Sequence, residues 1–200
     1  MTLAEALLNA MLKYHSTRVP ERYWGESGPE REARISRIAE ANVHACRTVK
    51  LPGRWTFGGC LALLQTVEQW ESGLQRDVHS GEKRGPAGEI CLVQLHHRVT
   101  APEAIHDPDY KVTEEEWESL GGLDIDATRR CAFAGAKILM YHASRCRIPF
   151  SADSWWMAAR IFAEFHHPDG ECHANVLPMS SHRGMTYASI YRRLLPRLED

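Results

Sequence analysis

The apolar stretch between Gly58-Gly59 and Ser72-Gly73 constrains the fold of this chain more than any other segment. Its large side chains recur at helical spacing, and they are Leu61, Leu63, Leu64, Val67 and Trp70. Glycine commonly follows the last turn of a helix, so we expect this one to end near Ser72-Gly73. The stretch therefore predicts the most apolar helix in the first half of the chain.

Helical periodicity extends to both sides of this stretch. Pro29 suits the first turn of one of these helices, because a proline there removes no helical hydrogen bond. The ranges with a helical pattern are 2–14, 29–48, 152–165 and 183–195.

Two helix starts are visible downstream. Thr113-Glu-Glu-Glu116 has the pattern of a capping box, in which Thr113 is the N-cap and Glu116 reaches back to it. A short helix is expected to follow. Either Asp124 or Asp126 is expected to cap a longer helix that runs to about Cys146.

The segment between the helices is less regular. Residues 75–90 are rich in glycine and charge, which predicts a loop or a short hairpin. The apolar run over residues 90–95 fits either a buried strand or a segment that lines the core. We therefore predict a mainly α-helical chain with one small, irregular β element.

Length and charge limit what the chain can be. Two hundred residues suit one domain, with residues 1–50 as an N-terminal helical extension, or part of the same domain, and residues 51–200 as the main domain. A formal net charge of -2 leaves no basic footprint for nucleic acid. No apolar run reaches the ~20 residues of a membrane span. The first residues lack the basic start of a signal peptide, so we expect a chain made in the cytoplasm.

Six cysteines occur without Cys-x-x-Cys spacing, and they allow 15 disulfide connectivities, among which sequence cannot choose. We interpret them as small buried apolar side chains, with at least one disulfide as the alternative. The histidines do not show the close spacing of a zinc site. We therefore expect no metal and no cofactor.

Glu71 is the residue that indicates chemistry. It stands at the end of the apolar helix, beside Trp70 and before Ser72-Gly73, where a cleft can form. Desolvation there favours the neutral carboxylic acid and raises its pKa. A glycosidase needs such an acid to protonate a leaving oxygen near neutral pH.

The surroundings of Glu71 resemble the lytic transglycosylases of the lysozyme-like superfamily. Glu71-Ser-Gly-Leu74, a serine nine residues after Glu71 and the block Gly88-Glu-Ile-Cys-Leu-Val-Gln94-Leu95 match that family's Glu-Ser-Gly-Phe, its serine and its Gly-Leu-Met-Gln-Leu block. Weaker likeness continues through Asp126–Leu139 and Trp156–His166, so that it covers about residues 55–195. The resemblance implies a lysozyme-like α+β catalytic domain.

The resemblance also implies roles for individual residues. Glu71 would be the single general acid and base, and the N-acetyl group of the substrate would assist at the anomeric carbon. The bond between N-acetylmuramic acid and N-acetylglucosamine would break with formation of a 1,6-anhydro product. Ser80 and Gln94 would bind the sugar, and we expect Trp70 to line the cleft.

The chain departs from the family in two places. An insertion after Ser80 adds Glu82 and Glu89, and either is a candidate second carboxylate that would position water and give a hydrolytic muramidase, as in goose-type lysozymes. Phe165 stands where the family has a tyrosine, and His166 is a candidate to replace its hydrogen bond. Loss of that tyrosine also leaves open a wall-binding scaffold with little activity.

The expected partner is the glycan strand of peptidoglycan, whereas the oligomeric state is unknown from sequence. Without a recognisable signal peptide, the chain would reach the wall in the manner of a phage lysis protein or by another delivery route.

Overall fold

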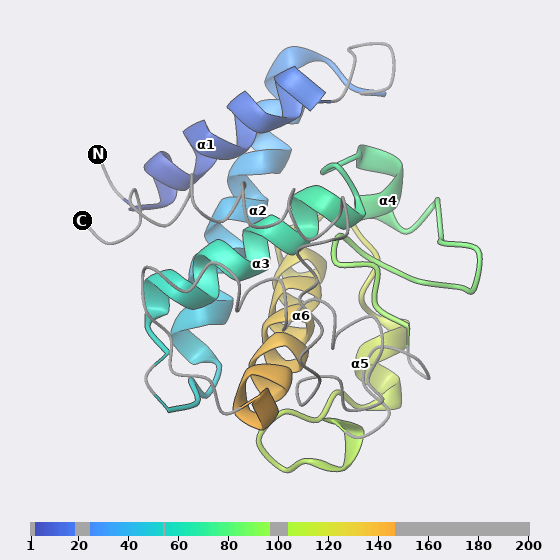
Figure 1. Ribbon diagram of the computed structural model, residues 1–200. Helices are drawn as coiled ribbons and strands as arrows, with labels where there is room; N and C mark the ends of the chain where they lie inside the picture. Colours follow the sequence, from blue (N-terminus) through green and yellow to red (C-terminus); the bar gives the residue numbers. More distant parts are fainter. Residues whose placement is uncertain (1–2, 19–24, 54, 97–103, 147–200) are drawn as a thin grey trace, which may run out of the picture.

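The computed structural model describes residues 3–18, 25–53, 55–96 and 104–146, and it is mainly helical there (Figure 1). The prediction of a mainly α chain is therefore confirmed. In these ranges the β element is reduced to an isolated antiparallel bridge between Ile90 and Leu95. The elements in chain order are α1 (Leu3–Arg18), α2 (Gly28–Thr48), α3 (Phe57–Glu71), α4 (Arg76–Ser80), the 3-10 turn η2 (Ala104–His106), α5 (Glu114–Glu118) and α6 (Ile125–Cys146).

Short polar side chains begin the main helices. Ser27 and Glu30 form a capping box at the start of α2, and Thr113 and Glu116 form the predicted one at α5. Thr56 accepts from the backbone N–H of Gly59 at 3.1 Å at the start of α3. These bonds satisfy donors that the first turn of a helix leaves free.

The two candidates for the cap of α6 are also resolved. Oδ1 of Asp124 accepts from the backbone N–H groups of Asp126 and Ala127, at 2.9 and 2.8 Å. Those bonds lower the pKa of the Asp124 carboxyl, because they stabilise its charged form. Asp124 is therefore the residue that starts α6.

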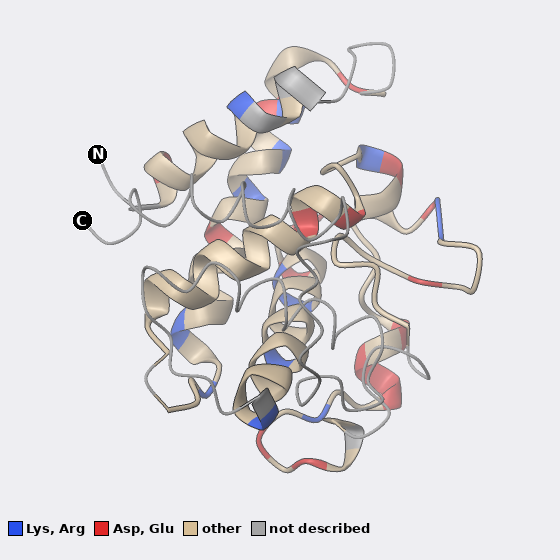
Figure 2. Cartoon of the chain, viewed as in Figure 1, with Lys and Arg blue, Asp and Glu red and all other residues tan. Residues whose placement is uncertain are grey.

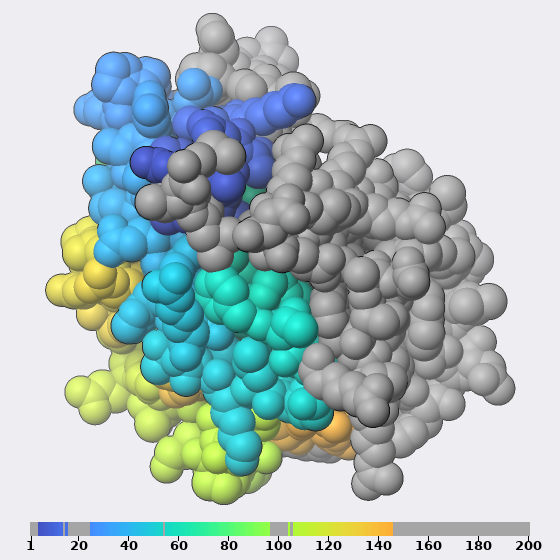
Figure 3. Space-filling view, turned by 90° about the vertical axis from the view of Figure 1, so that its left-hand side faces the viewer, coloured from blue at the N-terminus to red at the C-terminus, as the bar shows by residue number. Residues whose placement is uncertain are grey.

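The core forms where α2, α3 and α6 meet. α2 and α6 make the most extensive helix pair, α3 packs against both, and α1 lies on α2. Figure 3 shows the surfaces of α2 and α3 side by side. One apolar cluster extends from Leu7 in α1 to Ala143 in α6. The helices of residues 1–50 therefore share a core with those that follow.

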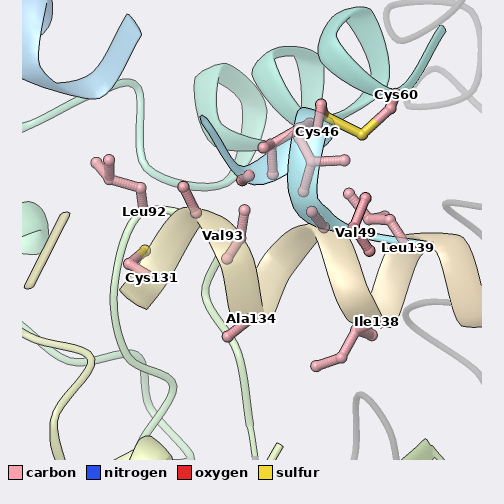
Figure 4. Packing of buried hydrophobic residues seen from close by; sticks show 14 of the residues in the cluster. Cys46, Val49, Cys60, Leu92, Val93, Cys131, Ala134, Ile138 and Leu139 are labelled. Atoms are coloured by element: carbon pink, nitrogen blue, oxygen red, sulfur yellow. A yellow bond between two sulfur atoms is a disulfide. The ribbon is translucent and has the colours of Figure 1, made fainter. Parts of the chain in front are cut away.

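Gly135 allows α6 to approach its neighbours closely. A Cβ atom at Gly135 would lie 3.0 Å from Cγ2 of Val93 and 3.2 Å from Cδ1 of Leu64. Val93 belongs to the irregular segment after α4, and Leu64 belongs to α3. The missing side chain thus lets one turn of α6 pack against both the helical core and this segment (Figure 4).

The cysteines correct the interpretation as free apolar side chains. Four of the six are buried and bonded, Cys46 to Cys60 and Cys91 to Cys131, with Cα–Cα distances of 5.7 and 6.0 Å, and Cys172 lies outside the described residues. The pairing follows from packing, since each pair joins segments that lie against each other, and Figure 4 shows the Cys46–Cys60 bond between α2 and α3. The spacing of the cysteines along the sequence does not show which of them lie close together in the fold.

Two further observations complete the fold. Residues 76–80, which we expected in a loop or hairpin, form the short helix α4, and Gly81 ends it with a φ of 80°. None of the helices described is long and apolar enough to cross a membrane. The predicted helices over residues 152–165 and 183–195 lie outside the described residues.

Candidate active site

Glu71 is the last residue of α3, and its side chain is half-buried. The buried Ser72 shapes the chain just after it. Its Oγ donates to the carbonyl oxygen of Glu68 at 2.6 Å and accepts from the backbone N–H of Leu74 at 3.1 Å. Gly73 and Leu74 then take left-handed conformations, with φ values of 58° and 56°. Ser72 therefore ends the helix and turns the chain away, which leaves Glu71 on the final turn.

Ser80 is the last residue of α4, and it is half-buried. Its Oγ donates to the carbonyl oxygen of Asp77 at 3.0 Å and accepts from the backbone N–H of Glu82 at 3.3 Å. The next residue, Gly81, packs directly on Gly121, because a Cβ on either would lie 3.3 Å from the Cα of the other. This close approach of two backbones places the end of α4 against Gly121, in the turn before α6.

His79 holds α4 against α6 from the buried side. Its Nε2 lies 2.9 Å from Oγ1 of Thr128, and Thr128 donates to the carbonyl oxygen of Asp124 at 2.6 Å. A hydroxyl that already donates its proton must accept, so the proton of His79 is on Nε2. The backbone N–H of Gly122 also donates to the carbonyl oxygen of His79, at 3.2 Å.

The ring of His79 is neutral. Burial lowers its pKa from 6.5 to about 3, and the positive charges of Arg34 and Arg37 add to this effect. His79 therefore acts as a fixed hydrogen-bond donor in the fold. It is not available as a base for a substrate, because its side chain is buried.

Gln94 lies in a tight turn that the Ile90–Leu95 bridge closes, with backbone hydrogen bonds of 2.9 Å in both directions. Nε2 of Gln94 donates to the carbonyl oxygen of Cys91 at 2.9 Å. Both residues are left-handed, with φ values of 49° for Gln94 and 60° for Cys91. The disulfide to Cys131 ties this turn to α6.

Strained backbone is concentrated in these segments. In the described part of the chain, the non-glycine residues with positive φ are Leu74, Cys91 and Gln94. All three belong to the two sequence blocks that carry the family resemblance. A conformation of this kind costs on the order of 1–3 kcal/mol per residue, and such residues cluster at functional sites.

The two candidates for a second carboxylate are used locally. Glu82 is exposed, and its Oε2 lies 3.5 Å from Nη1 of Arg76. Oε2 of Glu89 accepts from the backbone N–H of Ala87 at 2.9 Å, and the Glu89 side chain fills the space that a Cβ at Gly85 would need. Glu89 thus shapes the loop after α4.

Glu68 is a carboxylate that our sequence reasoning missed. It lies one turn before Glu71 in α3 and is fully buried, and its Oε2 is 2.6 Å from Nδ2 of Asn42 in α2. Burial raises its pKa from 4.5 to about 8, against the opposing effect of the Asn42 hydrogen bond. The spacing Leu61, Leu64, Glu68 places it on a core-facing side of the helix, and this was the available signal.

Three further residues that we expected at the site are Trp70, Phe165 and His166. Trp70 is half-buried and packs against the core cluster. Phe165 and His166 lie outside the described residues. No group of three or more metal-ligating side chains is found within residues 3–18, 25–53, 55–96 and 104–146.

Comparison with family models, curated proteins and solved structures finds no match for this chain. Its function is therefore inferred from its own residues.

Proposed function

We propose that this protein is a peptidoglycan lytic transglycosylase with a lysozyme-like domain. The observation that carries the proposal is the coincidence of strained backbone with the two sequence blocks around Glu71 and Gln94. A strained turn persists only where its surroundings hold it, and here Ser72 and the Cys91–Cys131 disulfide do so. Such support is expected where a chain positions groups for chemistry.

Glu71 is the proposed general acid and base. It gives its proton to the glycosidic oxygen as the bond to C1 of N-acetylmuramic acid breaks, while the acetamido oxygen of the same sugar bonds to C1. The C6 hydroxyl oxygen then replaces the acetamido oxygen at C1, and Glu71 takes the hydroxyl proton. The products are a 1,6-anhydro sugar and a strand that ends in N-acetylglucosamine, with Glu71 protonated again.

Ser80 and Gln94 are the proposed sugar-binding residues. The amide nitrogen of Gln94 is committed to the Cys91 carbonyl, so its amide oxygen would accept from a sugar hydroxyl or N–H. The hydroxyl of Ser80 would exchange its bond to the Asp77 carbonyl for one to the acetamido group. Trp70 would lie against a sugar ring beside Glu71.

The surroundings of the other carboxylates favour the anhydro product over hydrolysis. Glu89 is held in a turn, and Glu68 is fully buried beside Asn42. Glu82 is exposed and is the one that would serve a hydrolytic muramidase, if it left Arg76 to position a water molecule. Of these three carboxylates only Glu82 is open to such a role, and the substrate-assisted route needs no second carboxylate.

The disulfides bear on where the enzyme would act. Structural disulfides persist in oxidising compartments and are rare in the cytosol. Cys46–Cys60 and Cys91–Cys131 therefore fit a protein that works on the wall outside the cytoplasm.

Mass spectrometry of soluble muropeptides tests the proposal. Purified peptidoglycan is digested with the wild type and with Glu71→Gln, and with Glu82→Gln and Glu89→Gln as matched controls. We expect anhydro-muropeptides from the wild type and both controls, and none from Glu71→Gln. Reducing-end products that disappear in Glu82→Gln would support the muramidase instead. No release by a folded wild type would support a wall-binding scaffold.

A further inference from the structure

A cavity of about 390 Å³ lies between the first turns of α2, the start of α4 and the turn before α6. Its charged lining consists of Glu26, Glu30, Arg34, Arg37 and Arg76. Figure 2 shows basic residues both along α2 and at the start of α4. The size suits a group of several non-hydrogen atoms rather than a single water molecule, which takes about 30 Å³ in the liquid.

The two carboxylates of this lining are already neutralised or bound. Both oxygens of Glu26 accept from Arg34, from its Nε at 2.8 Å and from its Nη2 at 2.5 Å. Oε2 of Glu30 accepts from the backbone N–H and the hydroxyl of Ser27, at 2.8 and 2.7 Å. Glu26 is thus neutralised by Arg34, whereas Glu30 keeps its charge, and three arginines against two carboxylates leave the lining net positive.

The arginines keep donors for a ligand. Arg37 uses its Nε to donate to the carbonyl oxygen of Leu123 at 3.0 Å, and that bond leaves both of its terminal amino groups for a ligand. Arg76 makes only a long contact with Glu82, at 3.5 Å, and its side chain is 36% exposed. Arg34 is almost fully buried, and within the described residues its Nη1 has no hydrogen-bond partner. Three guanidinium groups thus face one space with two engaged carboxylates.

The positive charges of these arginines lower the pKa values of neighbouring titratable groups. After burial, Arg34 and Arg37 are the main causes that lower the pKa of His79, and Arg34 has the same effect on His15. The pKa of Glu30 is lowered first by its bonds to Ser27, and Arg76 lowers it further. These three groups belong to α1, α2 and α4, so the positive charge of the arginines acts on more than one element.

We propose that this cavity binds a small oxyanion, a carboxylate or phosphate group, between Arg37 and Arg76 and above the buried Arg34–Glu26 pair. A guanidinium group presents paired N–H donors that match two oxygens of either group. The proposal does not depend on the function proposed for Glu71. Arg76 is the first residue of α4 and Ser80 is the last, so an anion held by Arg76 also fixes the start of the helix that carries Ser80.

Isothermal titration calorimetry of the whole protein tests this site with two probes, inorganic phosphate and N-acetyl-D-alanyl-D-alanine. The variants are Arg37→Gln with Arg76→Gln, and Arg76→Gln alone, which alters a partly exposed side chain and so keeps the test valid if the double variant does not fold. Arg129→Gln is the control, because it removes one positive charge from an exposed ion pair with Glu40, outside the cavity lining.

We expect saturable binding by the wild type and by Arg129→Gln, and an affinity at least tenfold lower in the double variant, with a smaller loss in Arg76→Gln. The tighter probe then identifies the source, a phosphate compound or a peptide carboxylate. Absence of binding by both probes would overturn the proposal. Equal affinity in all the variants, or equal loss in Arg129→Gln, would overturn it as well.

Discussion

The helical core and the segment from Ser72 to His96 are held together in different ways. In the core, α2, α3 and α6 bury apolar side chains in one continuous cluster. The segment contributes Leu74, Leu92 and Val93 to the same cluster, and polar contacts additionally fix its irregular chain: the Ser72 hydroxyl, the His79–Thr128 bond and the Gln94 amide. Apolar burial stabilises the fold in proportion to the area removed from water, whereas these hydrogen bonds specify the position of individual groups. The segment carries the proposed sugar-binding residues Ser80 and Gln94, whereas Glu71 and Trp70 lie at the end of α3.

Each region also contains a buried titratable side chain, and the pKa values of the two are shifted in opposite directions. Glu68 in the core is a carboxyl whose pKa is raised, and His79 in the segment is an imidazole whose pKa is lowered. Burial is the main cause in both, and it favours the neutral form of each. The stability of the two regions should therefore respond to pH in opposite directions.

Removal of the disulfide between Cys91 and Cys131 should lower the unfolding free energy more than any other change in the segment. Replacing both with serine removes a link that spans 40 residues, which corresponds to about 4 kcal/mol of unfolding free energy in the chain-entropy model. Chemical denaturation measures the loss, and hydrogen exchange should show it first in residues 90–95. The matched variant, without Cys46–Cys60, opens a loop of 14 residues and should lose about 3 kcal/mol. A larger loss there would contradict the expected order.

Glu68→Gln tests the core carboxyl. Between pH 4.5 and about 8, folded Glu68 holds a proton that the unfolded chain releases, so wild-type stability should fall as the pH rises. The slope for one proton is at most about 1.4 kcal/mol per pH unit. Denaturation at several pH values should show this slope in the wild type and its loss in Glu68→Gln. Parallel curves would show that Glu68 is not the cause.

His79→Gln tests the segment, and it should change the pH dependence of stability on the acid side, below pH 6.5. Between pH 6.5 and about 3, the unfolded chain binds a proton that folded His79 does not, so wild-type stability should fall as the pH falls. Glutamine retains an N–H donor for Thr128 but does not titrate. The difference in unfolding free energy between the two proteins should therefore narrow with acid. A constant difference down to pH 4 would contradict the lowered pKa.

Ser72→Ala should have the smallest effect on stability. It removes one hydroxyl that closes the turn after α3, which is worth about 1 kcal/mol. Activity on peptidoglycan should fall more than this loss of stability explains, because the turn sets the position of Glu71. Ser144→Ala is the control, since that hydroxyl also donates to a carbonyl within a helix, far along the chain from the site. Equal effects on activity would argue against a positioning role for Ser72.

Local signals explain what was predictable from the sequence. The capping residues Thr113 and Glu116 and the glycine after α3 act on backbone groups only a few residues away. The helix start and the helix end that they produce could therefore be predicted from the sequence. Residues 76–80 form a helix too short for periodicity to show.

Other features depend on contacts between distant segments. The disulfide partners are chosen by how α2 meets α3 and how the Gln94 turn meets α6. The burial of Glu68 depends on Asn42 and on the packing of α2 against α3. Desolvation was expected at Glu71, but complete burial belongs to Glu68 one turn earlier, because the helix end is less covered than its middle.

The central claim is that Glu71 works on the substrate while Glu68, one turn away, serves the fold. The most direct test is the initial rate at which the wild type, Glu71→Gln and Glu68→Gln clear a suspension of purified peptidoglycan, with folding verified by circular dichroism. We predict a loss of at least about 100-fold for Glu71→Gln, as expected for removal of a general acid, and a rate within about threefold of wild type for Glu68→Gln. An active Glu71→Gln beside an inactive but folded Glu68→Gln would contradict the account.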